Sequence, residues 1–439
     1  MEKLLRFFEK IIPKSIYKKL QPAYHYFLAA SAAFIYGFPS EKMLVIGVTG
    51  TKGKSTTSNL IHHILNSSGY KTGLATTVNF KIGDEEWLNK EGKTMLGRFK
   101  LQKLLSQMAR ENCVYAVIET SSEGILQFRH RFINYSAAVF TNLSPEHIEH
   151  HGSFENYRDA KIKLFEKVAQ KENSVGVYNL DDENTKYFLR PKIKNRCFYA
   201  LNPDKKQRIN IQNLNIISNV KLTIDGTNFS FNKEKFEMSL IGEFNIYNAA
   251  AAICVGLSQN IPIEKIKKVL KSVKPVPGRM ENIEEGQNFT VFVDYAHTED
   301  SLKNALMFLK NLAKKKIIVV FGCGGDRDKS KRPKMGAVAS ELANKVIITS
   351  DNPRSEDQNL ILSQIKSGIQ NSESRIKNKI LYEIVDRKQA IKKAISLAKK
   401  DDIVLIAGKG HETYQIFKDK IIHFDDREEV RAMLTNLSK

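Results

Sequence analysis

The chain has few of the features that mark secreted or membrane-spanning proteins. Among 439 residues there are four cysteines, and Cys113, Cys197, Cys254 and Cys323 lie too far apart to predict a zinc knuckle or a dense disulfide framework. No stretch approaches the roughly 20 apolar residues of a spanning helix. The start also lacks the charged, apolar and small-residue regions of a signal peptide. These absences favour a cytoplasmic protein in a reducing compartment.

Acidic residues are scarce relative to basic ones. Lys plus Arg number 69 and Asp plus Glu number 48, which gives a formal net charge of +21. Such an excess suits nucleic acid, an anionic membrane or phosphorylated small molecules, and a lysine-rich proteome would produce the same count. The basic residues are scattered, and the sequence contains no nucleic-acid motif with an aromatic or arginine signature. Nucleic acid is therefore not an expected partner.

Residues 1–40 are predicted to form a short helical N-terminal segment. The opening MEKLLRFFEKIIPKSIYKKL is basic and amphipathic, with apolar residues near helical spacing. A helix packed on its own protein is favoured over an anchor at a membrane surface, and contact with a membrane surface stays open as the alternative. The apolar residues of the pattern are Leu4, Leu5, Phe7, Phe8, Ile11 and Ile12.

The remaining sequence predicts two α/β domains, at 41–278 and 279–439. Up to about residue 200, apolar runs such as YAVIETSS and SAAVFTNLS alternate with helical patterns, as in a parallel sheet with binding residues at the carboxyl ends of its strands. Residues 208–240 alternate with period two and include DGT as a turn, which predicts short antiparallel strands. The break PVPGRM marks the predicted domain boundary. Beyond it, strands such as FTVFVDYAH and DDIVLIAGKG predict a Rossmann-like domain.

The strongest motif is GVTGTKGKSTT, which lies between an apolar run and a helical pattern. Gly47, Gly53, Lys54 and Ser55 fit the phosphate-loop pattern, and Gly50 adds a flexible position. In such loops backbone N–H groups and a helix N-terminus surround the phosphates, the lysine reaches the terminal phosphates, and the serine hydroxyl joins Mg²⁺. By itself the motif leaves kinase, ATPase, GTPase and ligase open. The loop residues expected to bind the nucleotide are Gly50, Thr51, Lys52, Gly53, Lys54, Ser55 and Thr56.

Further runs narrow the reaction class by resemblance. The chain resembles the Mur ligase family from Met43 to Lys439 through GTKGKST, IETSS, FTNLSPEHIEHHGSFENYRDAK, GEFNIYN, PGRME, VDYAHT and FGCGGDRDKSKRPKMG. The runs SDNPRSED and GKGHETYQ are similar to those of members that add meso-diaminopimelate to UDP-N-acetylmuramoyl-L-Ala-D-Glu, a peptidoglycan precursor. The resemblance implies an ATP-dependent amide ligase. The γ-phosphate of ATP activates a carboxylate as an acyl phosphate, which an amine then attacks. A monomer is expected.

The resemblance also implies the metal site and the catalytic residues. Glu119 in YAVIE and His147 in SPEHIEHHG match the family's metal-binding residues, with Ser55 as a further Mg²⁺ ligand. Lys161 in YRDAK matches the family's carbamylated lysine, whose carbamate is an anion able to bind Mg²⁺. Together with Lys54, these residues form the implied catalytic set. An ordinary strand-end carboxylate is the alternative for Glu119.

Six further residues are implied nucleotide contacts. Arg279 in PGRME would contact a phosphate, and Asp294 in VDYAH would hold the ribose. Turn or packing roles are the alternative for these positions. The full set is Asn142, Asn245, Arg279, Asp294, Tyr295 and His297.

The residues of DNPR and GKGHE bear on which amine attacks. Arg354 offers a planar fork for a carboxylate, which favours diaminopimelate over lysine, since lysine would present an ammonium. By resemblance, Arg354 contacts the distal carboxylate and Glu412 accepts from an ammonium. A surface salt bridge at Arg354 and a glycine turn at Gly408 are the alternatives. The implied pocket consists of Arg327, Asn352, Arg354, Gly408 and Glu412.

The donor half departs from the family pattern. Only 46 residues precede Gly47, where members carry an N-terminal domain for uridine diphosphate, so a shortened donor anchor is expected. The threonine-rich turn expected before LQKLL reads KTMLGRFKLQKLL, and the family's SSHAL reads SSEGI, which places Glu123 where a histidine is expected. Ser121, Gln127 and Arg129 still match substrate-contacting positions. The alternatives are another acyl donor or amine, such as L-lysine or glutamate, a folylpolyglutamate-like ligase, or a degenerate ATPase that acts as an assembly factor.

Overall fold

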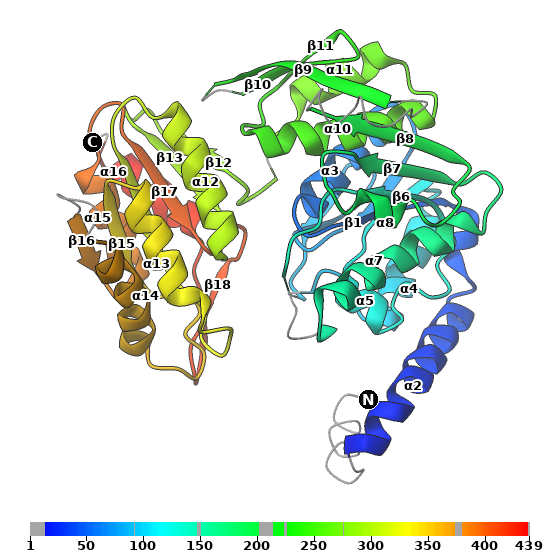
Figure 1. Cartoon of the computed structure of the whole chain (residues 1–439), viewed down its shortest axis with the longest axis horizontal. Coiled ribbons are helices and arrows are strands. Elements are labelled where there is room, and N and C mark those ends of the chain that lie inside the picture. Colours follow the sequence, from blue (N-terminus) through cyan, green and yellow to red (C-terminus); the bar gives the residue numbers. More distant parts are fainter. Residues whose placement is uncertain are drawn as a thin grey trace. The chain divides into compact units, whose positions relative to one another are not determined.

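Two compact units make up the chain, Met1–Val273 and Lys274–Lys439. Each is built around its own sheet (Figure 1). The computed structural model describes residues 14–91, 93–146, 151–201, 214–223, 226–274, 276–373 and 380–437.

The first unit contains an eleven-stranded sheet in the order β11-β10-β9-β8-β7-β6-β1-β5-β2-β3-β4. The strands from β9 to β2 pair in parallel, and antiparallel strands extend both ends. Central strands such as LVIGVT are almost wholly buried, because helices cover both faces of a parallel sheet. The bounds are β1 Leu44–Thr49, β2 Thr72–Ala75, β3 Asn79–Ile82, β4 Glu85–Leu88, β5 Tyr115–Glu119, β6 Tyr135–Phe140, β7 Val175–Asn179, β8 Asn195–Ala200, β9 Leu214–Leu222, β10 Thr227–Phe231 and β11 Glu234–Met238.

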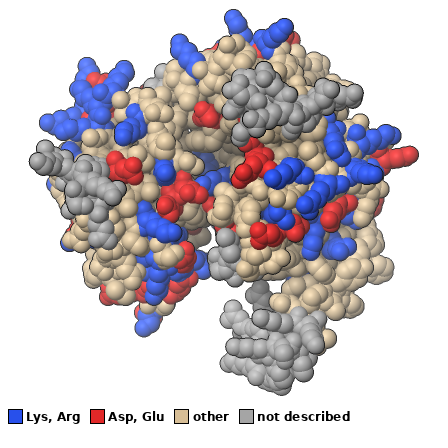
Figure 2. All heavy atoms as spheres, in the orientation of Figure 1, with Lys and Arg blue, Asp and Glu red and all other residues tan. Residues whose placement is uncertain are grey.

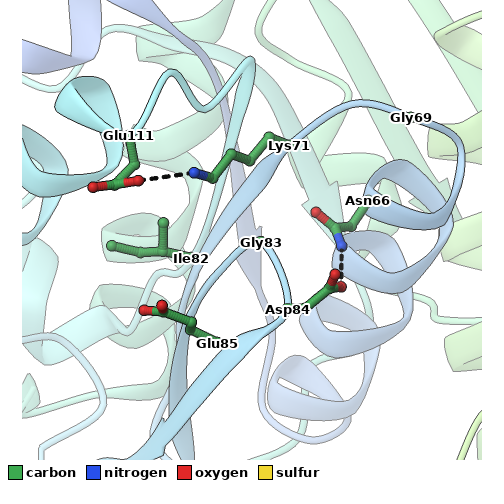
Figure 3. Close-up of a pocket in the computed structure, with 8 residues that line it drawn as sticks. All are labelled: Asn66, Gly69, Lys71, Ile82, Gly83, Asp84, Glu85 and Glu111. Atoms are coloured by element: carbon green, nitrogen blue, oxygen red, sulfur yellow. Dashed lines mark hydrogen bonds and ion pairs between the residues drawn. The ribbon is translucent and has the colours of Figure 1, made fainter.

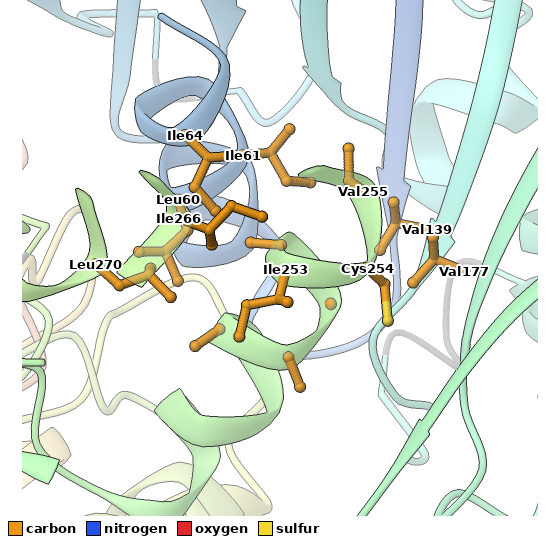
Figure 4. Close-up of a cluster of buried hydrophobic side chains, with 14 of the residues drawn as sticks. Leu60, Ile61, Ile64, Val139, Val177, Ile253, Cys254, Val255, Ile266 and Leu270 are labelled. Atoms are coloured by element: carbon orange, nitrogen blue, oxygen red, sulfur yellow. The ribbon is translucent and has the colours of Figure 1, made fainter. Parts of the chain in front are cut away.

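Successive residues of a strand point to opposite faces, so the sheet has a hydrophobic core on each side. Ile46 and Val48 of β1 join one core, and Val45 joins the other. The first core includes α3, α10 and α11, and α10 is buried nearly all round (Figure 4). The helices of the unit are α2 Lys14–Ile35, η1 Pro39–Lys42, α3 Lys54–Ser67, α4 Arg98–Arg110, α5 Ser122–Leu126, α7 Phe154–Ala169, α8 Thr185–Phe188, α10 Glu243–Ser258 and α11 Ile263–Ser272.

Helix α2 confirms the expected helical N-terminal segment and has two unlike faces. Its small residues Ala29, Ala32 and Ala33 are buried, and α2 contacts α4. Phe27 and Phe34 are 68% and 76% exposed. Figure 1 shows the helix extending away from the rest of its unit. The predicted amphipathic residues Leu4 to Ile12 lie outside the described residues. Within the described part of the chain, no helix is long and apolar enough to cross a membrane.

The second unit is the expected Rossmann-like α/β domain. Its six-stranded sheet has the order β12-β13-β17-β14-β15-β16, parallel except for β12, and β18 and β19 form a separate hairpin. The strands are β12 Glu281–Ile283, β13 Thr290–Asp294, β14 Ile317–Phe321, β15 Lys345–Ile348, β16 Ile380–Glu383, β17 Ile403–Ala407, β18 Tyr414–Ile416 and β19 Ile421–His423. The helices are α12 Glu299–Leu312, α13 Lys331–Leu342, α14 Gln358–Glu373, α15 Arg387–Leu397 and α16 Asp426–Leu437.

The predicted antiparallel strands of 208–240 are confirmed as β9, β10 and β11, which pair in that order. Residues 208–213 and 224–225 lie outside the described residues. Strand β9 also pairs in parallel with β8, and this pairing makes the three strands part of the large sheet. On the face shown in Figure 2, basic and acidic side chains are interspersed and do not form a single patch. All four cysteines are free thiols, and only Cys197 is partly accessible.

Candidate active site

The loop between β1 and α3 requires glycine at two positions. Gly50 has φ of 150°, and a Cβ there would lie 2.0 Å from Thr141 Oγ1. Gly53 has φ of 79°, and a Cβ there would lie 2.2 Å from Asn248 Oδ1. Neither position has room for a side chain, and Gly53 also adopts a left-handed conformation that L-residues disfavour. The loop backbone can therefore approach its neighbours, and a ligand, closely.

Residues after β6 hold this loop in place. The backbone N–H of Lys52 donates to Asn142 Oδ1 at 2.9 Å, and Asn142 Nδ2 donates to the Lys52 carbonyl at 3.0 Å. Thr141 Oγ1 donates to the same carbonyl at 2.8 Å. The backbone N–H of Thr51 donates to the Asn142 carbonyl at 2.9 Å. Asn142, a predicted nucleotide contact, thus has its side-chain amide bonded to the loop backbone and orients the loop.

The start of α3 suits an anion. Its N-cap is Gly53, which provides no side-chain cap, and the first turn has no acidic residue. A helix N-terminus of this kind carries partial positive charge and N–H donors. Lys54 is half-buried, and its Nζ donates to the Thr51 carbonyl at 2.7 Å. The lysine therefore lies folded against the loop that it follows.

A chain of side-chain bonds links α3 to α10. Thr57 Oγ1 donates to Asn248 Oδ1 at 3.2 Å, and Asn248 Nδ2 donates to Asn245 Oδ1 at 3.0 Å. Asn245 Nδ2 in turn donates to the Ile241 carbonyl at 2.8 Å. Asn245 thus reaches the phosphate loop through Asn248. The sequence analysis missed Asn248, although it lies three residues after Asn245 in GEFNIYN and so on the same helix face.

Ser55 and Glu119 form a pair of oxygen donors beside the loop. Ser55 Oγ donates to Glu119 Oε2 at 2.8 Å, and the Thr77 backbone N–H donates to the same oxygen at 2.8 Å. Glu119 is 2% exposed. The pair arises because β5 lies beside β1 in parallel, with Glu119 opposite Val48. Hydroxyl and carboxylate oxygens fit the ligand preference of Mg²⁺.

The third predicted metal ligand lies beyond what the structure describes. His147 is outside the described residues. Within those residues, no group of three or more His, Cys, Asp or Glu side chains could hold a metal ion. Serine and a modified lysine are not members of such a group, so Ser55, Glu119 and Lys161 are judged by their own contacts.

Lys161 lies on α7 and points at the same loop. It is 1% exposed, its Nζ donates to the Gly50 carbonyl at 2.7 Å, and it lies 4.5 Å from the centre of the Tyr157 ring. Burial lowers the pKa of Lys161 well below its ordinary value, and the charge of Lys54 lowers it further, whereas Glu146 and Glu119 raise it. The neutral amine that this favours is the form able to react with carbon dioxide.

The predicted donor-contacting residues lie around α5. Ser121 caps this helix, since its Oγ accepts from the Gly124 backbone N–H at 3.1 Å. Gln127 Oε1 accepts from Arg129 Nη2 at 2.6 Å, and Gln127 Nε2 donates to Glu123 Oε1 at 3.0 Å. The structure brings Gln127 and Arg129 together and places Glu123 beside them, whereas Ser121 bonds to its own helix.

In the second unit, four predicted nucleotide contacts lie together after β12 and β13. Asp294 Oδ2 accepts from the Met280 backbone N–H at 2.8 Å, so the carboxylate fixes the turn that carries Arg279. The Arg279 guanidinium lies 4.7 Å from the centre of the Tyr295 ring. The ring of His297 lies 4.5 Å from that of Tyr295.

The predicted amine pocket is built around a buried lysine that the sequence analysis missed. Lys409 is 0% exposed, and its Nζ donates to Glu412 Oε2 at 3.1 Å and to Asn352 Oδ1 at 3.2 Å. Asn352 Nδ2 also donates to Glu412 Oε2, at 2.8 Å. A Cβ on Gly408 would lie 2.8 Å from Asp351 Oδ2. The structure therefore brings Asn352, Gly408 and Glu412 together, as predicted, around Lys409.

Asp351 is the second carboxylate of this cluster. Burial alone would raise its pKa, but the charges of Lys409 and Arg387 lower it below the ordinary value. Arg387 is itself buried and paired with Asp426 at 2.7 Å. Lys409 and Asp351 stand within the runs GKGHETYQ and SDNPRSED, whereas no motif signalled Arg387.

The two predicted arginines flank Gly324. A Cβ on this glycine would lie 2.9 Å from Arg354 Nη1 and 3.7 Å from Arg327 Cγ. Arg354 Nη1 donates to the Gly325 carbonyl at 2.8 Å, and its backbone has φ of 52°. Arg327 is exposed, with Nη1 3.4 Å from the Asp326 carbonyl. Arg354 is thus the more tightly positioned of the two.

A surface pocket in the first unit lies elsewhere, at the far end of α3 from the phosphate loop. Lys71 forms an ion pair with Glu111 at 2.9 Å across it, and Asn66 Nδ2 donates to Asp84 Oδ1 at 2.8 Å (Figure 3). None of the predicted site residues lines it. The lining residues are Asn66, Gly69, Lys71, Ile82, Gly83, Asp84, Glu85 and Glu111.

Comparison with known proteins gives consistent matches. Residues 48–256 match the Mur ligase middle domain, and residues 278–410 match the Mur ligase, glutamate ligase domain. UDP-N-acetylmuramoyl-L-alanyl-D-glutamate–2,6-diaminopimelate ligase of Bacillus cereus is 42% identical over 417 residues, which cover 93% of this chain and 81% of that protein. The enzyme of the same name from Geobacillus kaustophilus is 40% identical over 413 residues, covering 92% and 81%. A solved structure of a ligase with this name has a TM-score of 0.65 at 33% identity and covers 90% of this chain and 79% of that chain.

Proposed function

Since the chain belongs to the Mur ligase family, whose members form amide bonds with ATP, we propose that it joins meso-diaminopimelate to UDP-N-acetylmuramoyl-L-Ala-D-Glu. The observation that carries the proposal is the convergence of three side chains on one loop. Ser55 and Glu119 are bonded to each other at 2.8 Å, and Lys161 Nζ is bonded to the Gly50 carbonyl at 2.7 Å. This arrangement places oxygen donors and a buried amine around a phosphate-binding loop.

The loop and α3 are proposed to bind the phosphates of ATP. Backbone N–H groups and the helix start provide neutral donors, and Lys54 adds a positive charge opposite the terminal phosphates. Ser55 and Glu119 fit Mg²⁺ by their oxygen chemistry, and His147 remains a proposed ligand. When bound, Mg²⁺ would neutralise the charge that otherwise keeps carboxylate and phosphate apart. Asn142 and Asn245 act through the loop, by the bonds described above.

Lys161 is proposed to be carbamylated. The neutral amine would attack carbon dioxide, forming an N–C bond and releasing one proton, and the product is a carbamate anion. Its oxygens would replace a cation, beside Lys54, with a ligand suited to Mg²⁺. Burial of the amine and its direct contact with the loop support this proposal.

The second unit is proposed to select the amine. Glu412 would accept from an ammonium group of diaminopimelate, and Arg354 would hold its distal carboxylate, with Asn352, Gly408 and Arg327 around them. Arg279, Asp294, Tyr295 and His297 remain proposed nucleotide contacts. The domain limits 41–278 and 279–439, the monomeric state, the cytoplasmic location and any contact of the N-terminus with a membrane surface likewise remain predictions.

A competition experiment tests the proposed function. The protein is incubated with ATP, Mg²⁺, UDP-N-acetylmuramoyl-L-Ala-D-Glu and equal amounts of meso-diaminopimelate, L-lysine and L-glutamate, and products are identified by mass spectrometry. The expected result is one dominant product, the diaminopimelate adduct, formed with one ADP per amide bond. A dominant lysine or glutamate adduct would contradict the amine assignment. ATP hydrolysis without any adduct would contradict the ligase assignment for this donor.

A further inference from the structure

A cluster of cationic groups lies where α2, α4 and the segment after α5 meet in the first unit. Arg98 is the first residue of α4, and Arg129 lies after α5. Both guanidinium groups contact Gln127. Arg98 Nη2 donates to its backbone carbonyl, and Arg129 Nη2 donates to its Oε1 at 2.6 Å. Arg129 Nη1 also donates to the Met95 carbonyl. All these acceptors are neutral, so the two positive charges converge on a residue that cannot neutralise them.

Three nitrogen atoms of this cluster have no partner in the described part of the chain. Arg98 Nε, Arg129 Nε and His25 Nδ1 are buried without a hydrogen bond. Arg129 is 8% exposed, and neither arginine forms an ion pair with a described residue. An unpaired buried charge is costly unless a ligand or water satisfies it.

One carboxylate lies near the cluster. The charge of Glu123 acts on Arg129, and the hydrogen-bond partner of Glu123 is Gln127, at 3.0 Å. A single carboxylate without an ion pair to either guanidinium leaves the cluster with a net positive charge.

The start of α4 adds to the same field. This 13-residue helix begins after Gly97, which provides no side-chain cap, and its first turn contains no acidic residue. Its free N–H groups and partial positive charge lie next to Arg98. Two arginines and an uncapped helix start thus form a concentration of donors with no internal anion.

The electrostatics of α2 agree with this geometry. Burial lowers the pKa of Arg98 to about 10, and the charge of Arg129 lowers it further. Burial lowers the pKa of His25 to about 4, and the charges of Arg98 and Arg129 add to that effect. Helix α2 therefore contributes a neutral imidazole to the cluster at pH 7, which can hydrogen-bond without adding charge.

We propose that Arg98, Arg129 and the start of α4 form a binding pocket for an oxyanion of the acyl donor that the reaction leaves unchanged, with His25 of α2 at its edge. This inference rests on the proposed function. On UDP-N-acetylmuramoyl-L-Ala-D-Glu the shared chemistry has two sources, the glutamate carboxylate that is not activated and the diphosphate. Arg98 stands in the run KTMLGRF, where the family pattern has a threonine-rich turn. A guanidinium replaces hydroxyl groups there, so Arg98 is a specificity-determining residue for the charge of the donor.

The first test separates donor binding from the other substrates. Steady-state kinetics compare wild type with Arg98→Gln, Arg98→Lys and Arg110→Gln, a control that removes an exposed arginine from the other end of α4. Arg98→Gln is expected to raise the donor KM about 30-fold while the KM values for ATP and diaminopimelate change less than twofold. Arg98→Lys should restore part of the loss, and Arg110→Gln should match wild type. A donor KM within twofold of wild type in Arg98→Gln overturns the proposal.

The second test identifies the oxyanion. Two modified donors are used, one with the free glutamate carboxylate converted to a carboxamide and one without the nucleotide. The modification that removes the bound oxyanion should weaken wild type about 30-fold and should have little further effect in Arg98→Gln. Loss with the carboxamide assigns the carboxylate, and loss with the nucleotide-free donor assigns the diphosphate. Equal losses in wild type and Arg98→Gln for both donors overturn the proposal.

A binding measurement separates failure of the pocket from failure of the proposed function. If wild type forms no product with any donor, the proposed function is wrong, and the pocket is tested with inorganic phosphate by isothermal titration. The phosphate loop is first filled with a non-hydrolysable ATP analogue and Mg²⁺. At least tenfold weaker phosphate binding by Arg98→Gln than by Arg110→Gln supports the pocket. Equal binding overturns it.

Discussion

Two glycine turns that both contain lysine, Gly50–Ser55 and Gly408–Glu412, follow parallel strands in the two units. Each turn has two glycines with positive φ, at 150° and 79° in the first and 115° and 53° in the second. In the first turn Lys54 is half-buried, bonds to a backbone carbonyl and opens a 14-residue helix. In the second turn Lys409 is wholly buried and bonds to Glu412 and Asn352.

The difference between the turns lies in where the lysine finds its negative partner. Lys409 has carboxylates of its own chain around it, so its charge stabilises the fold and orients Glu412. No carboxylate bonds to Lys54, and the helix start beside it favours an anion from outside. A glycine-lysine turn therefore indicates a phosphate site only when the chain provides no internal anion.

The largest expected effect is on stability, from the second turn. Lys409→Met leaves Asp351 and Glu412 buried without their cation and should lower the free energy of unfolding by about 3–5 kcal/mol. Urea denaturation followed by far-UV circular dichroism measures the loss. The double variant Lys409→Met/Glu412→Gln should recover at least about 1 kcal/mol, because one uncompensated charge is removed. A loss below about 1 kcal/mol in Lys409→Met would show that the lysine is not the counterion of the cluster.

The matching change in the first turn should affect the reaction and leave stability nearly unchanged. Lys54→Ala removes the charge opposite the phosphates and should lower the rate of product formation about 10²- to 10³-fold. Its free energy of unfolding should stay within about 0.5 kcal/mol of wild type, since no internal anion loses a partner. Fluorescence of Trp87, the single tryptophan, reports unfolding of the first unit. Lys103→Ala, an exposed change in the same unit, is the control for rate and stability.

The glycines of the two turns rank by the space that a methyl group would meet. Gly50→Ala, with Thr141 Oγ1 2.0 Å from the new Cβ, should cost about 2–3 kcal/mol of unfolding free energy. Gly408→Ala, with Asp351 Oδ2 at 2.8 Å, should cost less, about 1–2 kcal/mol. Gly37→Ala is the control for backbone strain alone, because nothing lies within 4 Å of its Cβ at φ of 67°. It should cost about 1 kcal/mol. Equal losses at all three sites would contradict the steric ranking.

The smallest effect concerns acid stability of the helix that follows the first turn. Burial of His62 on α3 lowers its pKa to about 4 from an ordinary 6.5. The unfolded chain thus binds this proton more readily, so the stability is fully present above pH 6.5 and is lost as the pH falls towards 4. From pH 7 to 5, wild type should lose about 2 kcal/mol more than His62→Gln. Urea denaturation followed by Trp87 fluorescence at both pH values measures the difference, and parallel losses in both proteins would contradict it.

Local patterns predicted the parts of the site that depend on neighbouring residues. The phosphate loop, its strand and its helix follow from GVTGTKGKSTT, because glycine conformation and helix capping are local properties. The carboxyl-end rule for parallel sheets also accounts for Glu119 lying beside Ser55, since β5 and β1 are neighbours. The alternating residues of 208–240 likewise predicted β9 to β11.

Contacts between distant parts of the chain could not be predicted in this way. Lys409 and Asp351 come together through strands β17 and β15, which are separated in the sheet by β14. Asn248 reaches Thr57 only because α10 packs on α3. Strand order, helix packing and the burial of a lysine depend on the whole fold, so no window of sequence contains them. The pairing of β9 with β8 was missed for the same reason.

The free thiols of the fold can serve as clocks for its opening. Cys113, Cys254 and Cys323 are buried, and Cys197 is partly accessible on β8. A thiol-reactive label should therefore modify Cys197 first and reach the others only when their surroundings open. Cys323 is the single cysteine of the second unit, so pulse labelling followed by peptide mapping would time the opening of each unit in one experiment without any engineered probe.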